Sequence, residues 1–215
     1  MAYSKFSLKD IKEQFGIELI EDKKLFSPET IRGAAISDYL KTTIEEFVPL
    51  ALAINTEKSR SEWIIAPILA ELHKQVKHRI SLFSGSTFTV DEEKGLDGQC
   101  DYLVSLSPEQ FYITAPVIII AEAKKEDIVK GLGQCISAMY AADIFNKNEK
   151  HPVDSVYGAV TSGTIWKFIK LTENKAYIDR DEYYLKEIEF IMGILLSIVV
   201  SDEKAAGEEK QCAES

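Results

Sequence analysis

The feature that most constrains the fold is an apolar run that ends in charged residues. Ile118, Ile119 and Ile120 lead into Glu122-Ala123-Lys124. A short run of branched apolar residues predicts a buried β-strand, and alternate side chains of a strand share one face. Glu122 and Lys124 therefore point the same way. Burying both charges costs free energy unless they pair, bind a metal or face a cleft.

Asp101 is the candidate partner for these two charges. It begins a predicted strand at residues 101–104, and a further strand is predicted at residues 80–90. Because only short turns separate these strands from the one ending at Lys124, we expect an antiparallel meander. Asp101 then lies near Glu122 if both residues occur at the same edge of the sheet.

The downstream pattern predicts an α/β fold with a mixed central β-sheet flanked by helices. A helix is expected at residues 127–145, followed by a strand at 156–160 that can pair parallel to the central strand. Apolar segments at 165–171 and 176–178 extend the sheet antiparallel. Extra helices are expected towards both ends of the chain.

Helix-start signals predict where these other helices begin. Ser7 caps a helix at residues 7–15, Ser27-Pro28 opens a second helix, and Ser59 opens a third. Glu62 has two interpretations: it completes a capping box with Ser59, or it faces the sheet and helps to hold a metal. The last helix is expected at residues 181–200.

Gly131, Gly133 and Gln134 lie together in the early turns of the helix predicted at residues 127–145. A glycine inside a helix costs about 1 kcal/mol relative to alanine. Two glycines in successive turns therefore indicate that another part of the chain approaches this helix closely.

Composition favours one domain in a reducing compartment. The chain has 215 residues, of which 46% are hydrophobic, so residues 1–200 can share one core, with a disordered acidic tail at 201–215. Three cysteines without a C-x-x-C pair argue against disulfides and zinc. The first residues show no signal-peptide core, so a cytoplasmic protein is expected.

The apolar residues 188–200 are too few for a membrane span and contain Glu189. They predict either a buried helix or a homodimer contact through Ile191, Leu195 and Ile198. A membrane partner is not expected.

The formal charge of −10 disfavours nucleic-acid binding unless basic residues gather locally. Two such groups exist, at residues 73–79 and at Lys124, Lys125 and Lys130. Such groups commonly form a solvated helix face.

The polar residues resemble, in order and type, those of the PD-(D/E)XK nuclease superfamily. Gly98-x-x-Asp101 matches its acidic second strand, Glu122-x-Lys124 its signature, and Gln134 its helix glutamine. The resemblance covers residues 57–171. Residues 57–62 also resemble the opening helix of an uncharacterised, largely cyanobacterial group assigned to this fold.

This chain departs from the superfamily pattern at two positions. Cys100 stands where a proline is common, and Ala138 stands where some branches carry a tyrosine. A tyrosine role is therefore not carried over to this chain.

The resemblance implies a restriction-endonuclease-like core and metal-dependent hydrolysis of nucleic acid, with DNA favoured over RNA. Asp101, Glu122 and Glu62 would hold Mg²⁺ or Mn²⁺. Lys124 would act on the attacking water or the phosphate, and Gln134 would position water or phosphate.

Two other interpretations stay open. The chain can be a catalytically inactive relative that binds nucleic acid or a protein partner. Alternatively, Asp101 and Glu122 can form a simple ion-pair network with Lys124, without any metal.

Overall fold

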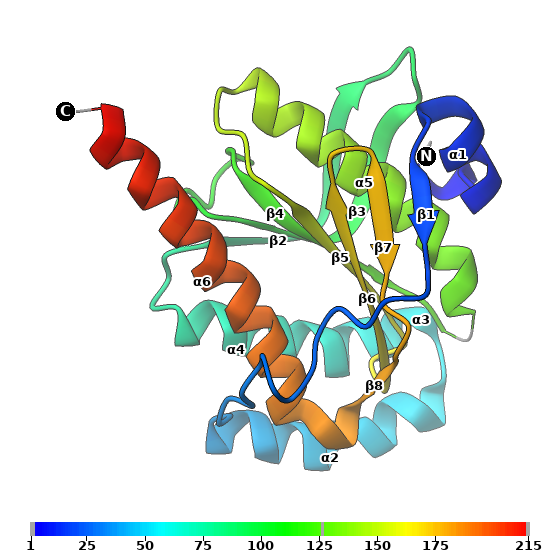
Figure 1. Cartoon of the computed structure of the whole chain (residues 1–215). Coiled ribbons are helices and arrows are strands. Elements are labelled where there is room, and N and C mark those ends of the chain that lie inside the picture. The colour runs from blue at the N-terminus through cyan, green and yellow to red at the C-terminus, as the bar shows by residue number, and fades with distance from the viewer. Residues whose placement is uncertain (1–2, 126, 214–215) are drawn as a thin grey trace.

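A computed structural model describes residues 3–125 and 127–213, with side chains described as far as residue 200. The chain is an α/β structure built on one mixed, eight-stranded sheet (Figure 1). Its strand order is β1-β7-β6-β5-β4-β3-β2, and β8 pairs with β6. The strands are β1 (Glu18–Ile20), β2 (Ser81–Asp91), β3 (Leu96–Ser105), β4 (Val117–Ala123), β5 (Val156–Thr161), β6 (Ile165–Thr172), β7 (Lys175–Ile178) and β8 (Tyr183–Tyr184).

The strand pairing confirms the topology expected from the sequence. β2, β3 and β4 form an antiparallel meander. β5 pairs parallel to β4 after a helical crossover, and β6 and β7 extend the sheet antiparallel. The short β1 adds parallel to β7 at the far edge.

Helices cover both faces of the sheet, and each face has its own hydrophobic core. The helices are α1 (Leu8–Phe15), α2 (Asp38–Ile54), α3 (Glu57–Arg60), α4 (Ala66–Gln75), α5 (Ile128–Asn148) and α6 (Ile188–Ala213). α4 and α6 pack on one face, with α2 outside them, and α5 and α1 pack on the other (Figure 1). A π-helical turn at Ser61–Ile65 joins α3 to α4.

Alternation along β4 decides which core each side chain enters. Ala121 and Ala123 belong to the core beneath α4 and α6, whereas Ile120 belongs to the core beneath α5. Glu122 has the same parity as Ile120, so it faces α5. All seven residues of β4 are buried, including Glu122. The polar end of this strand therefore enters the interior between the sheet and α5.

Two helix starts differ from the sequence-based prediction because other contacts supply the caps. α2 begins at Asp38 instead of near Ser27, since the Ser37 side chain caps it and Glu71 binds Ser37 through two hydrogen bonds. α3 begins at Glu57, where Thr56 and Ser59 exchange capping hydrogen bonds. The predicted capping box between Ser59 and Glu62 is therefore wrong.

The C-terminal helix also starts later than predicted. Tyr183 and Tyr184 pair with β6, and α6 begins at Ile188. α6 continues to Ala213, into the segment predicted as a disordered tail. The side chains of that segment and residues 214–215 lie outside the described part, so the tail stays a prediction.

The buried-helix interpretation of residues 188–200 is confirmed. Ile191, Leu195 and Ile198 are 0%, 0% and 2% exposed within the single chain. The predicted dimer contact through these three residues is wrong, because the chain's own core already covers them. Among the described helices, none has the length and hydropathy that crossing a bilayer requires.

The glycines of α5 confirm the predicted close approach. A Cβ on Gly133 would overlap the carbonyl oxygen of Phe6, and a Cβ on Gly131 would meet the side chains of Val160 and Lys124. The N-terminal segment and the end of β4 therefore pack directly on the first turns of α5.

We expect Gly133→Ala to lower the free energy of unfolding by about 1–3 kcal/mol, because the new methyl group cannot fit against Phe6. At an open helix position the same change would stabilise the helix by about 1 kcal/mol. Urea unfolding monitored by circular dichroism measures the difference. Val129→Ala, at a side chain that is 65% exposed in the same helix, is the control and should change stability by less than about 0.5 kcal/mol. An unchanged or increased stability of Gly133→Ala would contradict the packing.

Candidate functional site

The antiparallel register brings Asp101 and Glu122 together. β3 pairs Tyr102 with Ala121, so the next positions along the two strands, Asp101 and Glu122, lie opposite each other. Regular pairing of β3 with β4 ends here, and Asp101 Oδ2 accepts a 2.8 Å hydrogen bond from the Ala123 N–H. The carboxylate thus replaces the lost strand contact and is held at the end of β4.

Glu122 is a buried carboxylate with one free oxygen. The side chain is 0% exposed, and its Oε2 accepts a 2.6 Å hydrogen bond from Gln134 Nε2. Its Oε1 is buried and has no hydrogen-bond partner among the residues that the structure describes. Burial, followed by the negative charge of Asp101, raises the pKa of Glu122 well above its ordinary value, and Lys124 offsets only part of this effect.

Lys124 lies directly beyond β4 and is largely enclosed. Its Nζ donates a 2.9 Å hydrogen bond to the Ala123 carbonyl and lies 3.6 Å from Glu57 Oε1. Only 18% of the side chain is exposed. Because Gly131 has no side chain, the aliphatic part of Lys124 can run along the start of α5. The ammonium group is thereby held beside the two carboxylates.

Glu57 is the acidic residue that sequence reasoning missed. It lies in the first turn of α3, reaches Lys124, and contributes to the raised pKa of Glu122 through its charge. Its helix was predicted to begin at Ser59, so Glu57 was not assigned to a helix that faces the sheet. A correct cap at Thr56 would have placed it there.

Glu62 does not occupy the position expected for it. Its Oε1 lies 3.5 Å from Lys58 Nζ, and 54% of its side chain is exposed. The structure thus brings together Asp101, Glu122, Lys124 and Gln134 as predicted, and it adds Glu57 in place of Glu62.

The π-helical turn is tied to the same strand. The Tyr102 hydroxyl lies 2.7 Å from Ser61 Oγ and donates a 2.9 Å hydrogen bond to the Ser61 carbonyl. Widening of the helix leaves main-chain carbonyls available to such donors. Tyr102 follows Asp101 along β3, so this contact fixes the short helix carrying Glu57 relative to the carboxylates.

The basic group at residues 73–79 lies away from these side chains. It ends α4 just before β2, whose first residue Ser81 pairs with Ser105, at the Val117 end of β4. Within this group, His73 and His78 contact each other through Nδ1 atoms 3.0 Å apart, and Arg79 donates to the Val76 carbonyl. The group therefore contributes no charge next to Glu122.

The donor set suits a hard divalent cation. Asp101 and Glu122 offer adjacent carboxylates, the Ala123 carbonyl lies between them and Lys124, and Glu122 Oε1 has an unused buried lone pair. Mg²⁺ commonly binds one or two carboxylates and keeps several waters. Within the described part of the chain, no group of three or more His, Cys, Asp or Glu side chains could hold a metal. A metal here would therefore depend on two carboxylates, the carbonyl and water.

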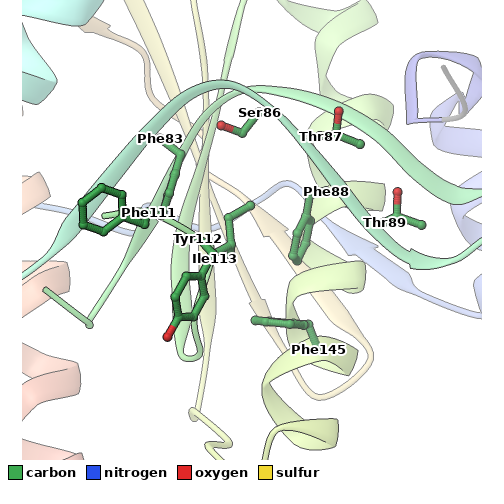
Figure 2. Close-up of a pocket in the computed structure, with 9 residues that line it drawn as sticks. All are labelled: Phe83, Ser86, Thr87, Phe88, Thr89, Phe111, Tyr112, Ile113 and Phe145. Carbon is green, nitrogen blue, oxygen red and sulfur yellow. The ribbon is translucent and has the colours of Figure 1, made fainter. Parts of the chain in front are cut away.

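The largest hollow with apolar walls lies elsewhere. Figure 2 shows a cavity of about 390 Å³ in which Phe83, Phe88, Ile113 and Phe145 point inward from β2, the β3–β4 loop and α5. Phe145 is near the end of α5, whereas Gln134 is near its start. The hollow contains none of the residues grouped around Glu122.

Comparisons with protein-family models, with curated proteins and with solved structures found no match for this chain. The function must therefore be argued from the residues themselves.

We expect the raised pKa of Glu122 to make stability fall with rising pH. The folded chain holds this proton more tightly than the unfolded chain, whose Glu122 ionises near 4.5. The contribution is complete below that value and is lost as pH rises through the higher folded pKa. Without metal, Glu122→Gln should therefore gain stability over the wild type between about pH 5 and about pH 8.

Urea unfolding across this pH range, in buffer containing a chelator, measures the effect. Glu21→Gln, at an exposed glutamate, is the matched control and should follow the wild type. Parallel pH profiles for Glu122→Gln and the wild type would contradict the raised pKa.

Proposed function

We propose that this chain is a metal-dependent nuclease of the PD-(D/E)XK type, which hydrolyses phosphodiester bonds of nucleic acid. The observation that carries the proposal is the buried Glu122 carboxylate, which lies opposite Asp101 and has an unpartnered oxygen. Leaving such a charge without a counter-ion is costly. A hard cation between the two carboxylates would relieve both the desolvation and their mutual repulsion.

The order of elements supports the same class. A helix that carries an acid, an antiparallel meander, a helix that carries glutamine and a parallel strand follow one another through α3, β2, β3, β4, α5 and β5. This is the arrangement that the resemblance to a restriction-endonuclease-like core implies. The functional residues come from the adjoining ends of these elements.

The side chains have distinct tasks in this mechanism. Asp101, Glu122 and the Ala123 carbonyl would hold Mg²⁺ or Mn²⁺, which supplies an acidified water and charge neutralisation at the phosphate. Gln134 donates to Glu122 Oε2 and leaves Oε1 for the cation. Lys124 can hold the scissile phosphate or orient the water with its ammonium group. Glu57 keeps Lys124 charged and in place.

The net charge of −10 makes this local arrangement necessary for a polyanionic substrate. A bound divalent cation and Lys124 would supply positive charge where the phosphate must approach. DNA is the favoured substrate, as the resemblance implies. Sequence-specific recognition would need contacts that this core does not identify.

A catalytically inactive nuclease-fold protein that binds nucleic acid or a protein partner is the second candidate. It is favoured by the pairing of basic residues around the site. Lys124 lies near Glu57, Lys58 near Glu62, and Lys130 near Asp127. Each pairing reduces the positive charge available to a phosphate backbone.

We expect the purified chain with Mn²⁺ to cleave at least one of supercoiled DNA, single-stranded DNA and RNA. Glu122→Gln and Lys124→Ala should each lower the rate by about 100-fold or more, because each removes charge stabilisation at the reacting phosphate. Gel assays of cleavage provide the measurement. Lys12→Ala, at an exposed lysine of α1, is the matched control and should keep the wild-type rate.

Metal binding is measured separately by thermal unfolding. Saturating Mn²⁺ should stabilise the wild type and Lys124→Ala, by about 2.7 kcal/mol at a hundredfold excess over the dissociation constant, but not Asp101→Asn or Glu122→Gln. Stabilisation without cleavage of any substrate would favour the inactive relative. The absence of both effects would favour a simple ion-pair network.

A further inference from the structure

The outer face of α2 is apolar and lacks a covering element among the described residues. Leu50, Leu52 and Ile54 of α2, with Trp63 of the π-helical turn, are between 36% and 49% exposed. We call these four side chains the α2 patch. Phe47 stacks on Trp63 with ring centroids 4.7 Å apart, which holds the tryptophan against the helix. In Figure 1, α2 lies outside α4, away from the sheet.

The burial of α2 does not match its sequence. Residues 47–54 carry no charged side chain, yet only Leu40 and Ala51 of the whole helix are buried. A helix segment with apolar residues on all sides is normally buried on all sides. By contrast, the similarly apolar residues 188–200 of α6 are enclosed by the chain's own core. The outer side of α2 therefore has the composition of an interface.

We propose that the α2 patch is the contact between two copies of this chain, which pack their α2 helices antiparallel about a two-fold axis. A two-fold contact requires a surface that is complementary to itself. An uncharged apolar face meets this requirement, because each copy offers the other the same kind of side chain. A strongly charged partner would find no opposite charge within residues 47–54.

The charges at the two ends of the patch fit the same geometry. Glu46 precedes the patch and is exposed, and Lys58 follows it with 81% of its side chain exposed. Antiparallel packing of Leu50 against Ile54 of the partner subunit turns the acidic end of one copy towards the basic end of the other. This complementarity selects an antiparallel arrangement, since parallel packing would set like charges together.

The contact adjoins the candidate site. α3 follows α2 directly, and its Glu57 reaches Lys124. Two copies joined through α2 would thus carry their Glu57 residues at the two ends of one interface. The dimer itself requires neither metal nor cleavage, so it can be tested independently of the proposed function.

Sedimentation velocity of the full chain over a range of concentrations tests the dimer. The wild type should sediment as a dimer at micromolar concentrations, and the double variant Leu50→Glu, Ile54→Glu should sediment as a monomer, because four buried carboxylates would face one another. Circular dichroism should show that this variant stays folded. Phe111→Glu, at an apolar side chain that is 96% exposed elsewhere, is the matched control and should remain dimeric.

A charge exchange tests the antiparallel arrangement with substitutions that do not threaten folding. Glu46→Lys and Lys58→Glu should each raise the dimer dissociation constant by about two- to fivefold. Combining the two substitutions should restore the wild-type value, because the pair is then merely reversed.

Two outcomes would overturn the dimer. A wild type that stays monomeric at all concentrations would do so, and a monomer that instead co-sediments with neutral phosphatidylcholine vesicles would assign the patch to a lipid surface. A dimer that persists in the Leu50→Glu, Ile54→Glu variant would place the contact elsewhere on the chain.

Discussion

The burial of the Glu122 carboxylate is the constraint on which the candidate site depends. The side chain is fully buried at the end of a strand whose other members are aliphatic, and Gln134 satisfies only one of its oxygens. Burial without full pairing favours the protonated acid, which accounts for its raised pKa. A cation between Glu122 and Asp101 would reverse this preference. The site therefore has two states, one protonated and one metal-bound, which compete for the same oxygens.

The surrounding packing keeps these groups in place. Phe6 lies against Gly133, next to Gln134, and Lys124 runs along Gly131. Asp101 binds the main chain of β4, and Tyr102 binds the π-helical turn that follows α3. Each functional side chain is thus next to a residue whose task is to hold two elements together. Rigid elements that meet in this way can position charges more accurately than loops can.

The central part of the fold could be predicted because its signals are local. Apolar alternation and turn residues define the meander, and the glycines of α5 indicate close packing. Helix starts were predicted less well, since several Ser or Thr residues can serve as caps and tertiary contacts select among them. Ser37 is selected by Glu71, which lies far away in the sequence. The error at α3 had a functional cost, because it drew attention to Glu62 instead of Glu57.

The sequence by itself determined that Glu122 and Lys124 share a strand face, because alternation is a property of the backbone. It also determined that Gln134 lies in the first turns of the next helix. Only the tertiary structure decided that Asp101 lies opposite Glu122, that Glu57 reaches Lys124, and that α6 is covered while α2 is not. Strand register and helix docking depend on how the whole core packs, and no local segment contains that information.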